Sequence, residues 1–300
     1  MKTRYGLADD FFPGAEALRQ AVEQHFAEPE RHTADRHQIW NYWYVPGSYT
    51  YLRTSPEKIV GPALAQQFHQ WLQRFAFETF GLINTTWPYL SLYVTGCHQA
   101  LHNDARGGRL GYVYSLTRWD ERNFAGGETL LFHEHAWRQD LTGAKATSSF
   151  YELIPQRFNQ LLVFDDRIPH GVPRIEGTME PLEGRIVVHG HMSEGGVTVE
   201  GNLGVEMVSP ILQPALAEIW HRREASAAHY HGLVVLRLEI GPEGGTPLCT
   251  LLFDRVLPAS PLNPPFPSGD LVEVFAACRF PAAEGPSRIT VPVAIGVALP

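Results

Sequence analysis

Three residues in the middle of the chain have types and a spacing that suit metal chemistry. His102 and Asp104 lie two positions apart, and His170 follows much later. In a β-strand, side chains two positions apart point to the same face, so His102 and Asp104 would approach one metal ion while Asn103 points away. Two imidazoles and one carboxylate on one face of Fe(II) leave three coordination positions open. The pattern predicts a mononuclear Fe(II) site made by His102, Asp104 and His170, with His170 on a second strand.

The order of the surrounding segments matters, because a single His-x-Asp tripeptide often arises by chance. After the tripeptide come a strand-like run at Leu110–Leu116, a turn at Gly126-Gly127-Glu128-Thr129 and a second strand-like run at Gln160–Phe164. Asp165 and Asp166 precede Pro169 and His170, and we interpret both as turn residues because aspartate is favoured in turns. The two histidines are therefore expected on different strands of one β-rich region.

A basic residue beyond His170 would suit an acidic co-substrate. A guanidinium is a planar fork that binds a carboxylate through two hydrogen bonds. Arg185 lies fifteen residues after His170 in a β-rich run, whereas Arg174 lies only four residues after it. We prefer Arg185 for this role, and Arg174 stays open as the alternative.

Together these motifs resemble the Fe(II)/2-oxoglutarate-dependent dioxygenases, in the prolyl-4-hydroxylase-like branch, over roughly Pro88 to Met192. The resemblance implies a double-stranded β-helix, Fe(II) as cofactor, 2-oxoglutarate as co-substrate and ascorbate as a reductant. It implies that Arg185 binds the distal carboxylate of 2-oxoglutarate, with Tyr93 as a further hydrogen-bond partner. The segment Glu176–Glu183 between His170 and Arg185 is longer than the family pattern and looks like an enlarged turn.

The family chemistry implied is hydroxylation of an unactivated C–H bond, with release of succinate and carbon dioxide. Asp104 occupies the position that related halogenases leave open for chloride, so the resemblance favours hydroxylation. The expected substrate is a peptide, an amino acid or another small metabolite. Two other interpretations remain: a cupin-like barrel that binds metal or a small ligand without turnover, and an iron oxygenase that uses no 2-oxo acid. Arg185 favours the 2-oxoglutarate-dependent dioxygenase over both of these, because neither needs a buried basic residue on that strand.

Further residues are candidates for the substrate pocket. His189 and His191 share strand parity with Arg185, so all three should point into the barrel. The alternative is that one of these histidines has only a structural role as a hydrogen-bonded interior residue. Trp40 and Tyr42 belong to an aromatic stretch before Pro46 and Gly47 and would form a pocket wall; packing over the core is the alternative.

Periodicity predicts a mainly β fold with flanking helices. Apolar spacing indicates helices at Ala15–Phe26 and Pro56–Gly81. From Pro88 the period changes to two, and eight short strands follow, a number that suits a jelly roll. We expect a dioxygenase domain over residues 1–205, with a helical N-terminal support at 1–87 and a β-helix core at 88–195.

Residues 206–300 read as a small α+β accessory domain. The pattern predicts helices at Pro210–Ala227 and Asp270–Cys278, and strands at Leu233–Ile240, Leu248–Val256 and Arg288–Val297. The run from Leu233 to Ile295 is weakly similar to the C-terminal domains of TonB-type proteins. We expect this part to serve as a homodimerisation or partner-binding module.

Composition narrows the classes of function. The chain has 300 residues, is 44% hydrophobic and carries a net charge of −8, which disfavours general nucleic-acid binding. The sequence contains neither an apolar run long enough to cross a bilayer nor a hydrophobic signal core, and its three cysteines fit a reducing compartment, so we expect a cytoplasmic protein without membrane contact. His133-Glu134-His135 has same-face spacing for zinc but lacks a third partner at motif spacing.

Overall fold

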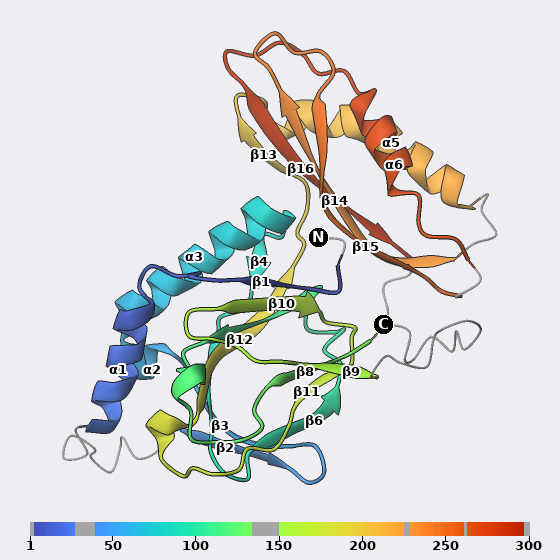
Figure 1. Cartoon of the computed structure of the whole chain (residues 1–300). Helices are drawn as coiled ribbons and strands as arrows, with labels where there is room; N and C mark the ends of the chain where they lie inside the picture. The colour runs from blue at the N-terminus through green and yellow to red at the C-terminus, as the bar shows by residue number, and fades with distance from the viewer. Residues whose placement is uncertain (1–2, 28–39, 134–149, 225–228, 261–262, 297–300) are drawn as a thin grey trace. The chain divides into compact units, whose positions relative to one another are not determined.

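The computed structural model describes residues 3–27, 40–133, 150–224, 229–260 and 263–296. Contacts divide the chain into two units (Figure 1). The larger unit consists of Arg4–Arg74 and Asn84–Ser193, and the smaller consists mainly of Phe75–Ile83 and Glu194–Pro300. Glu134 and His135 of the possible zinc tripeptide lie outside the described residues, as does the end of the predicted helix at Pro210–Ala227.

The larger unit is built on one antiparallel sheet of twelve strands among its described residues. Eight of them, β5 to β12, follow Pro88, and the mainly β fold with a jelly-roll core is as predicted. The path through the sheet is β1-β10-β7-β12-β5-β3-β6-β11-β8-β9, with β2 paired to β3 and β4 to β12. The strands are β1 (Tyr5–Ala8), β2 (Asn41–Val45), β3 (Tyr49–Thr54), β4 (Asn84–Thr85), β5 (Tyr89–Tyr93), β6 (His98–His102), β7 (Leu110–Ser115), β8 (Thr129–Phe132), β9 (Tyr151–Ile154), β10 (Leu161–Asp165), β11 (His170–Val172) and β12 (Arg185–Ser193).

Strand β12 lies between β5 and β7, and this central position determines which of its residues are buried on each face. Ile186, Val188 and Met192 are 0–2% exposed and form part of the core. Because side chains alternate along a strand, Arg185 and the other odd-numbered residues point to the opposite face. The register places Arg185 opposite Tyr93 on β5 and His191 opposite Gly111 on β7.

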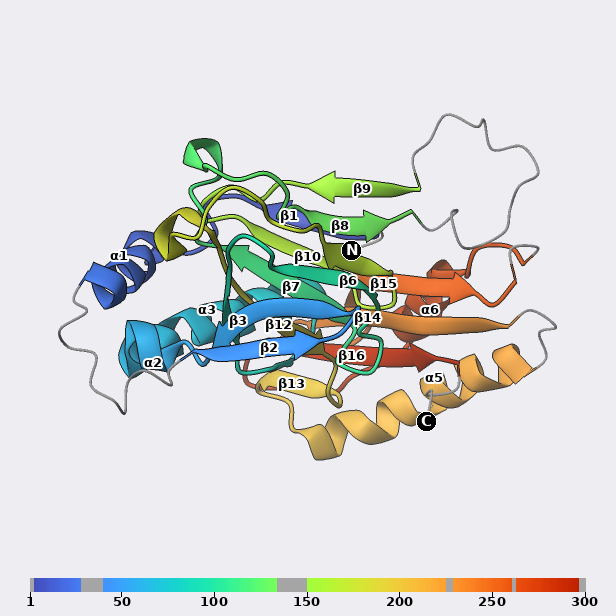
Figure 2. The same cartoon turned by 90° about the horizontal axis from the view of Figure 1, so that it is seen from below.

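The N-terminal region contributes more than helices. It contains α1 (Ala15–Ala27), α2 (Glu57–Val60) and α3 (Pro62–Phe80), but also strands β1 to β4. The single helix expected at Pro56–Gly81 is interrupted at Gly61, whose φ of 82° is incompatible with a continuous helix. Pro62 then begins α3, because a proline at the first helical position needs no N–H partner. Figure 2 shows β2 and β3 side by side as a hairpin.

The smaller unit has a four-stranded sheet in the order β13-β16-β14-β15. Helices α5 and α6 lie along one face of this sheet (Figure 1). Helix α5 begins earlier than the predicted Pro210, so Pro210 and Pro214 lie inside it. None of the helices in the described parts of the chain combines the length and apolar character needed to cross a bilayer. The elements are β13 (Thr198–Gly201), α5 (Val205–Glu224), β14 (Tyr230–Ile240), β15 (Leu248–Pro258), α6 (Ser268–Ala276) and β16 (Ser287–Ile295).

The end of α3 completes the core of the smaller unit on the other face of its sheet. Phe80 is 6% exposed and meets Phe253 of β15 edge-on, with ring centroids 6.3 Å apart. Gly81 has a φ of 70°, and a Cβ there would lie 2.5 Å from Val235 Cγ1 of β14. Glycine therefore both ends the helix and permits this close packing.

Candidate metal centre and its cavity

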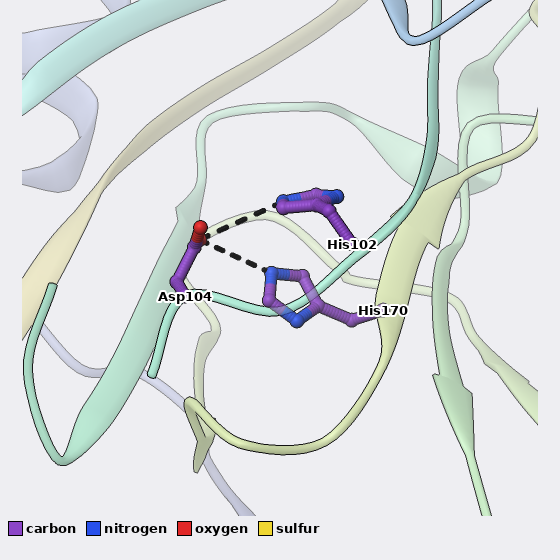
Figure 3. A group of neighbouring side chains, drawn as sticks. All are labelled: His102, Asp104 and His170. Atoms are coloured by element: carbon purple, nitrogen blue, oxygen red, sulfur yellow. Dashed lines mark ion pairs between the residues drawn. The ribbon is translucent and has the colours of Figure 1, made fainter. Parts of the chain in front are cut away.

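Strand pairing brings the two predicted histidine ligands together. Strands β6 and β11 are antiparallel neighbours, and His170 lies opposite His102 with ring centroids 4.3 Å apart. Asp104 follows β6, where its backbone N–H donates to the Asp166 carbonyl oxygen at 2.9 Å. Asp104 Oδ2 lies 3.6 Å from His102 Nε2 and 3.4 Å from His170 Nε2 (Figure 3). Among the described residues, the three side chains form one of two groups with metal-ligand spacing.

Main-chain carbonyls fix the orientation of both imidazoles. His102 Nδ1 donates to the carbonyl oxygen of Ala100 at 2.8 Å, and His170 Nδ1 donates to that of Ile168 at 2.9 Å. A carbonyl oxygen only accepts, so the proton of each neutral ring belongs on Nδ1 and the lone pair on Nε2. Both Nε2 atoms point toward Asp104. The rings are therefore held in the tautomer and direction that metal binding requires.

The electrostatics of the three residues favour an ionised carboxylate. Burial acts to raise the pKa of Asp104, but hydrogen bonds from His102 and His170 and the charges on those rings outweigh it, so the pKa lies below its ordinary value. Burial acts to lower the pKa of His102, yet the hydrogen bonds to Asp104 and Ala100 raise it overall. A divalent metal would replace the protons shared among these groups.

Arg185 is a buried cation in the same cavity as His102, Asp104 and His170. Arg185 is only 3% exposed. Its Nη2 donates to Thr129 Oγ1 at 3.2 Å and to Gln156 Oε1 at 3.5 Å. Burial lowers its pKa. No carboxylate among the described residues lies within ion-pair distance of it. A buried guanidinium without a carboxylate partner is suited to an anionic ligand.

The structure separates the two candidate arginines. The Arg174 side chain is 63% exposed, and its Nε donates to Glu176 Oε1 at 2.7 Å. It does not line the cavity that contains Arg185. Of the two candidate arginines, only Arg185 is buried in the cavity that holds His102, Asp104 and His170.

Tyr93 lies beside Arg185 on the neighbouring strand. The Arg185 Cζ is 4.9 Å from the centroid of the Tyr93 ring, and the two side chains also share a hydrogen bond. The ring stacks on Tyr51 with centroids 5.1 Å apart and 16° between planes. Burial raises the pKa of Tyr93, so its hydroxyl stays protonated and remains a donor at neutral pH.

His189 and His191 both line the cavity, and both also have internal partners. His189 Nε2 lies 2.7 Å from Ser91 Oγ; burial and the charges of Arg53 and Arg185 lower the pKa of His189 to about 3, so this ring is neutral. The two interpretations of these histidines, pocket lining and interior hydrogen bonding, therefore hold together for His189.

His191 is held beside the candidate metal ligands by a buried aspartate. Its Nδ1 lies 3.0 Å from Oδ2 of Asp166, which is 0% exposed, and burial raises the pKa of Asp166 to about 6. A side chain at Gly111 would come within 2.5 Å of Asp166 Oδ1, so only glycine fits opposite this pair. Asp166 is thus more than a turn residue, because it anchors His191.

Trp40 and Tyr42 do not line the cavity, contrary to the prediction. Tyr42 is 64% exposed and stacks on Tyr44, with ring centroids 6.2 Å apart. Trp40 Nε1 donates to His25 Nε2 at 3.2 Å, away from the cavity. Side chains alternate along β2, so the wall residue of this stretch is Trp43. For Tyr42 the prediction had the right strand and the wrong face, whereas Trp40 precedes the strand.

Strand β3 supplies wall residues that the sequence interpretation missed. Tyr49, Tyr51 and Arg53 line the cavity, which has a volume of about 400 Å³. The alternation of these three residues with Thr50 and Leu52 was the available signal. It was overlooked because the segment was assigned to a helical support region.

No family model matches the sequence, and no curated protein matches it, so the resemblance of the C-terminal part to TonB-type domains is unsupported. Among solved structures, a Pseudomonas putida prolyl-4-hydroxylase is 15% identical, covers 64% of this chain and 92% of its own, and has a TM-score of 0.41. SnoN, a non-haem α-ketoglutarate-dependent epimerase from nogalamycin biosynthesis, is 12% identical, covers 63% and 76%, and has a TM-score of 0.43. Identity and superposition are both low, so the assignment of function below depends on the residues of the site.

Proposed function

We propose that this chain is an Fe(II)- and 2-oxoglutarate-dependent dioxygenase that hydroxylates an unactivated C–H bond of a peptide, an amino acid or a small metabolite. Succinate and carbon dioxide are the co-products. One observation carries the proposal: two oriented imidazoles and an ionised carboxylate converge in a cavity that also contains the buried guanidinium of Arg185. A metal-binding barrel without turnover has no need of that cation.

The donor set fits Fe(II). His102, Asp104 and His170 would hold the iron, since two imidazoles and one carboxylate are the ligand set of non-haem Fe(II) oxygenases. When bound, the iron supplies the activation of dioxygen that is coupled to decarboxylation of 2-oxoglutarate. The backbone carbonyls of Ala100 and Ile168 keep both ring nitrogens aimed at the ion. Ascorbate is proposed as a reductant that keeps the iron in the ferrous state.

Arg185 and Tyr93 would bind the distal carboxylate of 2-oxoglutarate. Thr129 and Gln156 accept hydrogen bonds from one end of the Arg185 guanidinium and so fix its plane. Gln156 is itself held by the Val113 carbonyl at 2.9 Å. The remaining donors of the fork and the Tyr93 hydroxyl are the groups that orient the co-substrate, and the buried setting strengthens their electrostatic attraction for it.

The test is anaerobic addition of Fe(II) and then 2-oxoglutarate to the purified protein. We expect a visible charge-transfer band that is absent from His170→Ala and weaker in Arg185→Ala. Two matched controls should retain the full band: Arg174→Ala removes an exposed arginine, and His221→Ala removes a histidine of α5 in the other unit. A wild-type protein that holds iron but develops no band would contradict the proposal and favour the non-catalytic barrel.

A further inference from the structure

A second arginine lines the cavity and has no role in the proposed binding of iron or 2-oxoglutarate. Arg53 lies on β3, opposite Ser91 of β5, and is half-buried. Its charge acts on His189, across the same wall of the cavity. Arg53 and Arg185 are thus two separate cationic positions along one wall.

Two aromatic rings clamp the Arg53 guanidinium. Its Cζ lies 3.6 Å from the ring centroid of Trp43 and 3.9 Å from that of Tyr89. The cation lies over both rings and is attracted to their faces, so it is held in place without an acidic partner among the described residues. Arg53 offers further ligands its in-plane N–H groups. A carboxylate is the group whose two oxygens match such a planar fork.

Most N–H donors of the Arg53 guanidinium have no hydrogen-bond partner among the described residues. Arg53 shares a hydrogen bond with the Tyr51 side chain. No carboxylate in the described parts of the chain lies within ion-pair distance of it. One hydroxyl uses a small part of the five N–H donors of a guanidinium.

The charges of the residues that line the cavity indicate that a ligand of Arg53 should be an anion. The formally charged residues that line it are Arg53, Arg185 and Asp104. In the proposed complex, Asp104 and the two charges of 2-oxoglutarate would balance a divalent metal and Arg185. Arg53 would then be the cation left without a counter-charge, in surroundings that desolvate it.

We propose that Arg53 binds the carboxylate of the substrate, and that the substrate is a small carboxylic acid. This inference rests on the proposed function, because it takes the substrate to share the cavity with iron and 2-oxoglutarate. A cavity of about 400 Å³ that also admits 2-oxoglutarate favours a small molecule. A single planar fork suits a carboxylate better than a phosphate, because the other cation of this wall, Arg185, is assigned to 2-oxoglutarate in the proposed complex.

The experiment compares acids with their uncharged amides as probes. The pairs are N-acetylphenylalanine and its amide, indole-3-acetate and its amide, and hexanoate and hexanamide. Dissociation constants are measured by saturation-transfer NMR on the full chain, both unloaded and loaded with Zn(II) and 2-oxoglutarate, where diamagnetic Zn(II) stands in for iron. We expect the loaded wild type to bind at least one acid about tenfold or more tightly than its amide, as a charge-assisted hydrogen-bonded pair implies.

The variants assign this preference to a residue. Arg53→Gln should abolish the acid preference, and Arg53→Lys, which keeps the charge and the aromatic clamp but loses the fork, should retain only part of it. Arg174→Gln, the surface control, should leave it unchanged. Three results would overturn the inference: no acid preference in the wild type, a preference that survives Arg53→Gln, or one that Arg185→Gln abolishes while Arg53→Gln does not.

Two different measurements distinguish failure of the proposed function from failure of this inference. Absence of the Fe(II) and 2-oxoglutarate absorption band argues against the dioxygenase. The acid preference of the unloaded chain and its dependence on Arg53 do not involve that band. An intact band without an acid preference would instead remove only the assignment of substrate class.

Discussion

Replacing Arg185 with methionine should weaken 2-oxoglutarate binding and, in the same molecule, stabilise the protein that has no ligand. The wild-type guanidinium is 3% exposed and has no carboxylate partner among the described residues. Replacing a buried ion pair with apolar side chains is commonly neutral or stabilising by about 1–4 kcal/mol, and a buried cation without a carboxylate within ion-pair distance has still less to compensate for its desolvation. The polar neighbours retain partners, because Thr129 Oγ1 donates to Gln156 Oε1 at 2.8 Å. We expect a gain of about 1–2 kcal/mol, since Arg185 also loses hydrogen bonds and its contact with the Tyr93 ring.

The two effects have separate measurements. A gain of about 1–2 kcal/mol raises the unfolding midpoint of the larger unit by about 2–8 °C. Loss of a charge-assisted fork costs about 2–4 kcal/mol of binding, so the dissociation constant of 2-oxoglutarate, measured by calorimetry on the Mn(II)-loaded protein, should rise by about 30- to 700-fold. An Arg185→Met protein that is less stable than wild type, or that binds 2-oxoglutarate equally well, would refute this account of the buried cation.

Three further predictions concern other residues. Asp104→Ala should abolish succinate formation while the circular dichroism spectrum stays native, because the proposed role of this carboxylate is to bind the metal and the side chain is not part of the core; undiminished turnover would exclude the metal assignment. Stability should fall as pH drops from about 6.5 toward 3, because His189 takes up a proton in the unfolded chain but not in the folded one, where burial lowers its pKa to about 3. Urea titrations should show a shallower dependence in His189→Asn, and an unchanged slope would refute that cause. Tyr42→Ala should leave the charge-transfer band and 2-oxoglutarate affinity at wild-type values, since Tyr42 is 64% exposed; a tenfold loss of affinity would return it to the pocket.

Local rules were enough for those parts of the site that depend on strand parity. The same-face relation of Arg185, His189 and His191 follows from alternation along one strand, and all three line the cavity. The meeting of His102 with His170 could not be derived that way. It depends on pairing between β6 and β11, which are separated by four strands in the sequence, and resemblance to a family supplied that expectation.

The errors also have physical causes. The stretch at Asn41–Val45 carries aromatic residues on both faces. Hydrophobicity therefore did not show which face points into the cavity, and Tyr42 was predicted in place of Trp43. Arg53 was missed because an arginine on a strand is usually solvated, and its aromatic clamp is built from two other strands. The break at Gly61 and the prolines inside α5 are cases where tertiary packing decides helix boundaries that local propensity leaves undetermined.

The division of α3 between the units has a consequence for biosynthesis. Phe75–Ile83 leaves the ribosome before any strand from β4 onward, but the strands that cover Phe80 and Gly81 are among the last to be made. Until β14 and β15 arrive, Phe80 and Gly81 lack the strands that cover them in the folded unit, and exposed apolar surface of this kind is what chaperones bind on nascent chains. A chain shortened near Gly204 would keep the segment permanently in that state. Poor solubility of such a fragment would then indicate only that the end of α3 is left uncovered. It would not show whether the C-terminal unit takes part in chemistry.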